Sequence, residues 1–260
     1  MEPTMNFWDF KMRQMRAVFG PNRYELDYYP APHGKEAPFA LIAPGGGYVF
    51  MADHFEGKPF ALEINKRGYH AFVLRYHTKQ KAFHPGPLMD MVRAVREILD
   101  NAEKYKVKKT GYSVWGSSAG GHLAACFSSE LLGWKRFGLP KPATTVLVYP
   151  VITMGEEAHK GSRNQLIGRN PSRELVREWS IEHQVTKDFP PTYIFNSDTD
   201  TVVPPVNSHM FVEAAKKAGI LYQYHRYKSG KHGCGPDRGG PCDGWIDEAI
   251  DFWRMNIAGR

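Results

Sequence analysis

Short apolar runs alternate with amphipathic stretches about every 30 to 40 residues, and this alternation limits the folds open to the chain. Six such runs are each of a length that suits one strand: 39–43, 70–77, 110–115, 144–149, 192–195 and 221–227. Stretches with helical spacing lie between them, the clearest at 88–105. The pattern predicts an α/β fold with a mostly parallel central sheet and helices on both faces. Right-handed crossovers then bring the carboxyl ends of the strands to one edge, where a site is expected.

The 260 residues are interpreted as a single domain. Residues 1–23 form an N-terminal extension, with a short helix expected over 6–19. Residues 151–190 follow a looser, more polar pattern and are interpreted as an excursion over the sheet edge. The other elements expected are a strand at 24–29 and helices at 56–67, 119–132, 206–218 and 245–257.

Residues 116–120 read Gly-Ser-Ser-Ala-Gly, a G-x-S-x-G pattern between an apolar strand and a helix. In that context the pattern predicts a sharp turn that exposes the central serine, Ser118, as a nucleophile. A tight turn whose glycines serve only packing is the alternative. If Ser118 is the nucleophile, Ser117 is only the variable residue of the G-x-S-x-G pattern.

A serine nucleophile needs a base and a third group that orients the base. In a parallel sheet of this kind these follow the serine in the order acid, then histidine. Asp200 follows the strand at 192–195, and His232 follows the strand at 221–227. Asp198 is the alternative acid.

Acyl transfer also requires N–H donors for the developing oxyanion. One is expected from Ala119, directly after the nucleophile. The other is expected from the glycine run after the first buried strand, with Gly46 preferred and Gly47 as second choice. A phosphate cradle is the competing interpretation of this run, but the Lys-Ser/Thr of a P-loop does not follow it.

Several segments together resemble the acetylxylan-esterase-like branch of the α/β-hydrolases, often described as acetyl, xylan or bifunctional acetyl/feruloyl esterases. These segments are Pro44–Tyr48, Gly116–Leu123, Tyr149–Met154, Gly161–Arg163, Asp200–Pro204 with Asn207 and Ser208, and Gly230–Gly233. The resemblance implies an α/β-hydrolase fold, a triad of Ser118, Asp200 and His232, and hydrolysis of short acyl esters without a cofactor or a metal.

The chain departs from this branch at two places. Many relatives carry paired aspartates where Thr199-Asp200 stands, which keeps the role of Asp198 open. The segment Gly233–Cys242 lacks the apolar stretch often found after the histidine, and we expect its loop to reshape the pocket.

Other residues near the motifs are assigned simpler roles. Tyr48 and Phe50 follow the glycine run and are expected to line the entrance to the site and to contact substrate. Trp115 is expected in the core, and His122 in a structural hydrogen bond. Arg75 and Asp90 are expected in buried polar contacts. Gly161-Ser162-Arg163 is interpreted as part of the excursion, with substrate contact as the less favoured role.

The net charge of +7 is spread over many segments and no nucleic-acid motif accompanies it, so a generally basic surface is the preferred interpretation. No apolar stretch reaches the roughly 18 residues of a membrane span. No signal peptide is apparent, and a cytoplasmic location is predicted, with a secreted mature form as the alternative. Cys126 is expected in the core. Cys234 and Cys242 flank a loop; two free thiols are preferred over a disulfide.

The sequence therefore predicts a serine carboxylesterase for short acyl, chiefly acetyl, esters on xylan-derived or other plant carbohydrates. Its partner is a small-molecule or oligosaccharide ester, with no nucleic acid and no membrane. Amide hydrolysis on the same fold, as in a peptidase or an arylformamidase, and feruloyl ester hydrolysis are the alternatives. A binding protein that has lost catalysis is a further alternative, which the intact Ser, Asp and His disfavour.

Overall fold

A computed structural model describes residues 24–258, and within them seven strands form one sheet in the order β1-β3-β2-β4-β5-β6-β7. The strands are β1 (Glu25–Tyr29), β2 (Phe39–Ala43), β3 (His70–Arg75), β4 (Ser113–Ser117), β5 (Thr144–Val148), β6 (Thr192–Ser197) and β7 (Tyr222–Tyr227). The edge strand β1 pairs antiparallel with β3, and the other pairings are parallel. The predicted mostly parallel sheet is confirmed.

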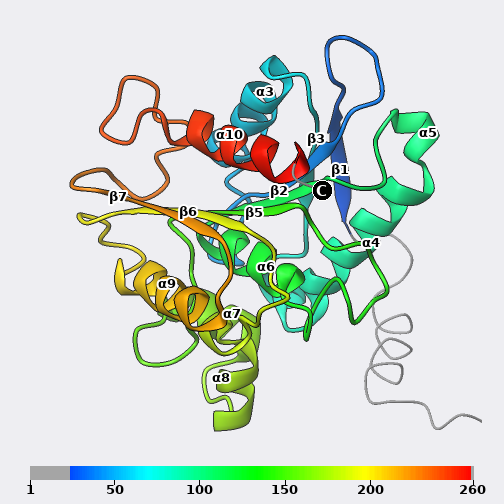
Figure 1. The fold of residues 1–260 in the computed structure, drawn as a ribbon. Coiled ribbons are helices and arrows are strands. Elements are labelled where there is room, and N and C mark those ends of the chain that lie inside the picture. Colours follow the sequence, from blue (N-terminus) through cyan, green and yellow to red (C-terminus); the bar gives the residue numbers. More distant parts are fainter. Residues whose placement is uncertain (1–23, 259–260) are drawn as a thin grey trace, which may run out of the picture.

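Helices cover both faces of this sheet (Figure 1). They are α2 (Asp53–Glu56), α3 (Lys58–Lys66), α4 (Gly86–Asp100), α5 (Ala102–Tyr105), α6 (Ser118–Ser128), α7 (Lys160–Ile167), α8 (Arg173–Trp179), α9 (Val206–Ala218) and α10 (Trp245–Ala258), with short 3₁₀ turns at Lys79–Ala82 and Ile181–His183. In Figure 1, α3 and α10 lie on one face, and α4, α6 and α9 lie on the other. The segment 151–190 adds α7 and α8 on the side of α6 and α9.

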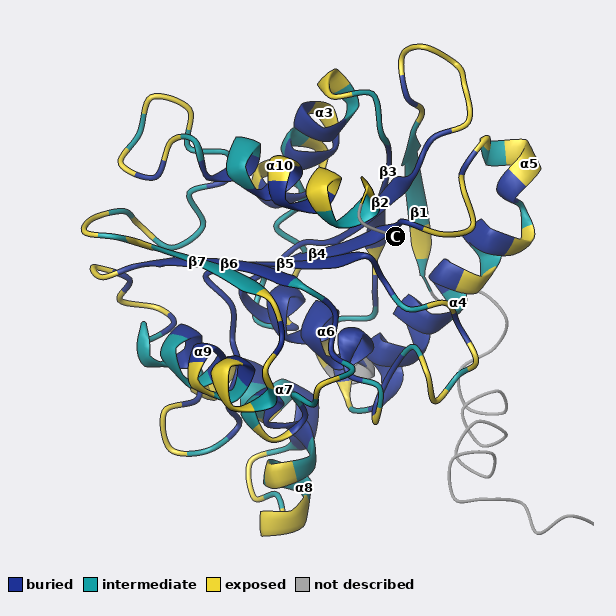
Figure 2. Cartoon of the chain, in the orientation of Figure 1, coloured by how far each residue is buried: buried dark blue, intermediate teal, exposed yellow. Residues whose placement is uncertain are grey.

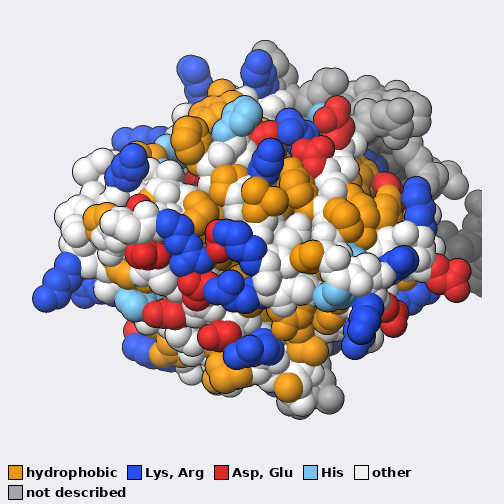
Figure 3. All heavy atoms as spheres, turned by 90° about the horizontal axis from the view of Figure 1, so that it is seen from above, with side chains coloured by type: hydrophobic (Ala, Val, Ile, Leu, Met, Phe, Trp, Pro, Cys, Tyr) orange, Lys and Arg blue, Asp and Glu red, His pale blue; other side chains and the backbone are white. Residues whose placement is uncertain are grey.

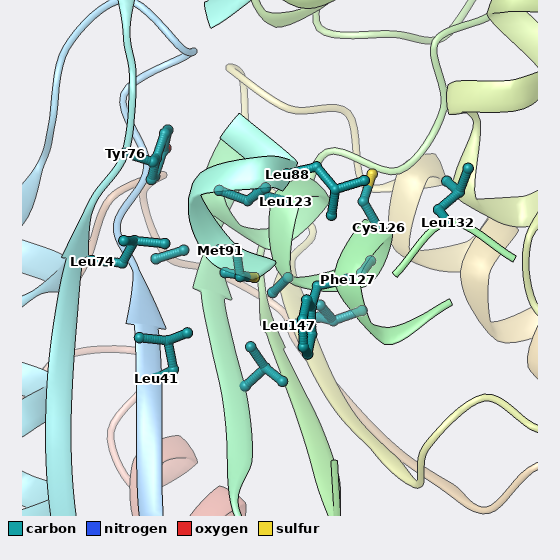
Figure 4. Packing of buried hydrophobic residues seen from close by; sticks show 14 of the residues in the cluster. Leu41, Leu74, Tyr76, Leu88, Met91, Leu123, Cys126, Phe127, Leu132 and Leu147 are labelled. Carbon is teal, nitrogen blue, oxygen red and sulfur yellow. The ribbon is translucent and has the colours of Figure 1, made fainter. Parts of the chain in front are cut away.

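The strands supply alternate side chains to the two faces, so each face has its own apolar layer. Along β2, Leu41 packs toward α4 and α6, whereas Ile42 packs toward α3 and α10. Figure 4 shows the first layer, in which Leu41, Leu74 and Leu147 of the sheet meet helix side chains such as Met91 and Leu123. The central strands are buried throughout (Figure 2), which explains their nearly continuous apolar runs.

Two predicted helices are divided in the structure. The one at 56–67 breaks at Gly57, where a side chain would lie 2.9 Å from both the Asp53 carbonyl oxygen and a Val73 methyl group. The one at 88–105 breaks at Asn101, between α4 and α5. Leu62 of α3 is 43% exposed, so it does not belong to the buried face of that helix. The helix expected at 6–19 lies outside the described residues.

Candidate active site

The turn between β4 and α6 has the tight backbone that the G-x-S-x-G pattern predicts, but Ser118 is 5% exposed and borders a pocket rather than the open surface. Ser118 is held at φ +53°, a backbone conformation that non-glycine residues rarely adopt. A Cβ on Gly116 would lie 2.1 Å from the Gly120 carbonyl oxygen, and a Cβ on Gly120 would lie 2.0 Å from the Ala43 carbonyl oxygen. The glycines therefore allow the backbone to close tightly, and the turn projects Ser118 at the carboxyl edge of the sheet.

Ser118, His232 and Asp200 form a chain of hydrogen bonds. Ser118 Oγ lies 2.9 Å from His232 Nε2, and His232 Nδ1 lies 2.7 Å from Asp200 Oδ2. The other carboxylate oxygen of Asp200 accepts from the backbone amides of Val202 and Val203, at 2.9 and 3.0 Å. These two amides fix the carboxylate, which orients the imidazole toward the serine. The alternative acid Asp198 instead pairs with Arg226 at the edge of β7.

The glycine run after β2 lies across from Ser118 and lines the same pocket. Gly46 and Gly47 both have positive φ, 123° and 64°, and a Cβ on Gly46 would lie 2.0 Å from the Phe50 carbonyl oxygen. Within residues 24–258, no acceptor pairs with the amides of Gly46 and Gly47. Their N–H groups are therefore available to a ligand, and the oxyanion hole at this loop stays a prediction.

The buried carboxyl group of Glu56, which the sequence analysis did not identify, connects the glycine loop with the surroundings of His232. Glu56 is 2% exposed; its Oε2 accepts from the Gly45 amide at 2.6 Å, and its Oε1 accepts from the Tyr149 hydroxyl at 2.8 Å. The Tyr149 ring lies 4.8 Å from the His232 ring, centroid to centroid. Burial raises the pKa of Glu56, while the Gly45 amide, the Tyr149 hydroxyl and His232 oppose that shift.

A pocket of about 500 Å³ opens beside Ser118 and His232, and its walls are largely apolar. Val49, Phe50, Phe55 and Val202 line it and are each exposed by more than a third. Phe50 therefore lies where the sequence predicts. The prediction for Tyr48 is wrong: it is 1% exposed, and its hydroxyl lies 2.9 Å from His122 Nδ1. The turn at Tyr48, with φ +61°, directs this ring into the core.

The excursion over the sheet reaches the same pocket through the residues before and within α7. His159 and Gly161 line the pocket, whereas Ser162 is fully buried behind them and contacts His159. The sequence gives substrate contact only as the less favoured role of Gly161. It does not indicate His159, because one histidine in a loop carries no pattern of its own.

The remaining predictions on polar and core residues are mostly confirmed. Trp115 is buried in the core, and His122 Nε2 lies 2.7 Å from the Trp179 carbonyl oxygen. Asp90 is buried and accepts from the His77 backbone amide at 3.0 Å. The prediction that Arg75 makes buried contacts is wrong. Arg75 is the last residue of β3, faces solvent and forms ion pairs with Asp27 and Asp53.

The cysteines carry free thiols in the structure. Cys126 is buried in the core, as predicted. Cys234 and Cys242 are not bonded to each other, and their sulfur atoms and a carboxylate oxygen of Asp237 lie within 4.8 Å of one another. Within residues 24–258, no helix combines the length and apolar character of a membrane span.

A mostly parallel sheet with a serine at a strand–helix turn, and with an aspartate and a histidine after later strands, defines the α/β-hydrolase class. The chain belongs within that class to the BD-FAE family, whose model matches residues 26–131.

Three proteins with known names are similar to this chain. The crystal structure of an acetyl ester-xyloside bifunctional hydrolase from Caldicellulosiruptor lactoaceticus matches at 32% identity and a TM-score of 0.80, over 92% of this chain and 90% of that one. Endo-1,4-beta-xylanase B of Butyrivibrio fibrisolvens is 36% identical over 74% of this chain and 32% of its own length. An acetylxylan esterase of Xylanibacter ruminicola is 30% identical over 74% of this chain and 40% of its own length. The chain thus spans 32% to 40% of these two curated relatives.

Proposed function

We propose that the protein is a serine carboxylesterase that hydrolyses short acyl, chiefly acetyl, esters. The observation that carries the proposal is the hydrogen-bonded chain of Ser118, His232 and Asp200. It faces a glycine loop in which two amides have no acceptor among residues 24–258. Nucleophile, base and oxyanion donors then border one pocket, which is the arrangement that acyl transfer needs.

In the proposed reaction, Ser118 Oγ attacks the ester carbonyl carbon while His232 Nε2 takes the hydroxyl proton. Asp200 holds the imidazole in the required tautomer and stabilises its positive charge. The amides of Ala119 and of Gly46 or Gly47 donate to the oxyanion. His232 then protonates the departing alcohol, and a water deprotonated by the same ring hydrolyses the acyl-enzyme.

We further propose that the substrate is a small-molecule or oligosaccharide ester, with acetylated xylan fragments as the first choice. The relatives named for acetylxylan and acetyl ester-xyloside hydrolysis support this choice. A pocket of about 500 Å³ is also within the size range of sites for single small ligands.

Replacing Ser118 by alanine tests the proposal. We expect Ser118→Ala to lower kcat for p-nitrophenyl acetate by about 10⁴-fold or more, because the nucleophile is lost while the fold persists. Ser117→Ala is the matched control, since the neighbouring hydroxyl is buried and lacks a hydrogen-bond partner among the described residues. A fluorophosphonate probe should label the wild type and the control but not Ser118→Ala. Turnover by Ser118→Ala at the wild-type rate would refute the proposal.

A further inference from the structure

The pocket beside Ser118 contains a second histidine, His159, that the proposed mechanism does not use. It precedes α7 and its ring lies against two glycines. A Cβ on Gly47 would lie 3.7 Å from His159 Cε1, and a Cβ on Gly161 would lie 3.1 Å from the same atom. The ring therefore lies in van der Waals range of the glycine loop and leaves little room for a side chain at Gly161.

The cap of α7 fixes the tautomer of this ring. The backbone amide of Ser162 donates to His159 Nδ1 at 3.3 Å, and Ser162 Oγ lies 2.8 Å from the same nitrogen. A backbone amide can only donate, so Nδ1 accepts, and the proton of the neutral ring lies on Nε2. Burial, the largest cause, lowers the pKa of His159; the nearby His232 lowers it further and Asp200 opposes the shift. The ring is then neutral at neutral pH.

The Nε2–H group is available to a substrate. Among residues 24–258, no acceptor is hydrogen bonded to it, and both hydrogen bonds of the ring involve Nδ1. Much of the pocket wall is apolar, and both oxygens of Glu56 are already engaged. His159 Nε2–H is thus a side-chain donor in the pocket that neither the triad nor the oxyanion loop employs.

The geometry points to His159 as a specificity-determining residue whose Nε2–H donates to a hydroxyl oxygen on the alcohol part of the ester. This inference rests on the proposed esterase function. The carbonyl oxygen of the scissile ester is assigned to the backbone amides, the bridging ester oxygen is assigned to His232, which protonates the departing alcohol, and an acetyl ester carries no further oxygen on its acyl side. The oxygen that His159 binds is therefore on the alcohol, which selects polyol and sugar esters over alkyl esters.

The variant His159→Asn isolates this donor. An asparagine oxygen can accept from the Ser162 amide and keep the helix capped, but the shorter side chain cannot place a donor at the Nε2 position. We compare kcat/KM for a monoacetylated xylose and for cyclohexyl acetate, two esters with rings of similar size. We expect the ratio of the two to fall about tenfold in His159→Asn, because one hydrogen bond to an uncharged hydroxyl is lost. His183→Asn, which changes an exposed histidine away from this pocket, should keep the wild-type ratio.

Each outcome is decisive. An unchanged ratio in a folded His159→Asn variant overturns the inference and leaves the esterase proposal standing. Failure of the wild type to hydrolyse either ester in a Ser118-dependent manner overturns the proposed function, and the inference with it. The tautomer has its own readout: ¹⁵N spectra of histidine-labelled protein, assigned by loss of the signal in His159→Asn, should show the proton on Nε2. A proton on Nδ1 would also overturn the inference.

Discussion

The buried His122 leads to a prediction about how the stability of the protein depends on pH. Its Nε2 lies 2.7 Å from the Trp179 carbonyl oxygen, which can only accept, so Nε2 carries the proton. Nδ1 then accepts from the Tyr48 hydroxyl at 2.9 Å. Both ring nitrogens are satisfied in the neutral form, and the ring is fully buried. Burial lowers the pKa of His122 to about 4, and the Trp179 carbonyl only partly opposes this.

This depressed pKa predicts that the free energy of unfolding decreases in acid. Between pH 6.5 and about 4 the unfolded chain binds a proton at this site that the folded protein excludes. The contribution of the neutral His122 to the free energy of unfolding is therefore fully present above pH 6.5 and is lost as the pH falls through that window. The loss attributable to His122 across this window is about 3 kcal/mol, because a tenfold change in proton affinity corresponds to about 1.4 kcal/mol. Urea titrations at pH 7.5 and pH 4.5 should show a smaller pH-dependent change in His122→Gln than in the wild type. Equal changes in the two proteins would contradict the prediction.

At the scale of single residues, the sequence identifies what motif order determines and misses what depends on side-chain direction. Ser118, Asp200 and His232 are predictable because each follows a strand in the order that the fold requires, and the structure brings them within hydrogen-bonding distance. Tyr48 is misassigned because nothing in the sequence shows that the turn points its ring into the core. His159 reaches the pocket only through the tertiary path of 151–190.

At the scale of elements, the break between α2 and α3 places Glu56 in the site. The sequence predicts one helix over 56–67, because Gly57 in a helical pattern is a weak signal by itself. In the structure the chain bends at Gly57, which packs against β3, and Glu56 faces the pocket from the last position of α2. The break depends on a steric contact between distant segments, and local periodicity does not contain it.

Glu56 is expected to act as a positioning residue. Glu56→Ala removes the acceptor of the Gly45 amide and the partner of Tyr149, so the glycine loop and the tyrosine beside His232 lose a common support. We expect kcat for p-nitrophenyl acetate to fall roughly 10- to 100-fold. This loss is at most about equal to the loss that follows when a direct oxyanion donor is removed. Glu56→Gln keeps one oxygen for the Gly45 amide and should lose less.

Steady-state kinetics separate this positioning role from general destabilisation. The loss should appear mainly in kcat rather than KM, at a temperature where circular dichroism shows both variants folded. A folded Glu56→Ala variant with wild-type kcat would show that the loop holds its shape without this carboxyl group.

At the scale of the whole molecule, the fold class is predictable because buried parallel strands require apolar runs at short intervals. The position of residues 151–190 relative to the site is not predictable from the sequence, because the path of this segment depends on its packing against α6 and α9. The net charge of +7 does not show how the charged side chains are distributed. Figure 3 shows Lys and Arg side chains interspersed with Asp and Glu on the face seen from above. Arg238 illustrates such pairing, with ion pairs to Glu63 and Asp247.

The prediction of a single domain leads to a test of cooperativity. The two apolar layers share the same strands, because alternate residues of β2 supply Leu41 to one layer and Ile42 to the other. Unfolding either layer would expose one face of the sheet and remove support from the second, so we expect one cooperative transition. Trp115 and Trp245 lie in the layer of α3 and α10, whereas Trp179 lies in the opposite layer.

Tryptophan fluorescence reports on both layers, more strongly on the layer of α3 and α10, which holds Trp115, Trp245 and Trp253, and far-ultraviolet circular dichroism follows the helices of both layers. Trp179→Phe removes a fluorophore of the opposite layer, so a larger share of the signal comes from the layer of α3 and α10. The buried indole N–H that it removes has no hydrogen-bond partner among the described residues. In urea, the midpoints from fluorescence and circular dichroism should coincide for the wild type and for Trp179→Phe. Separate midpoints would mean that the two layers unfold independently, and the shared strands would then not couple them.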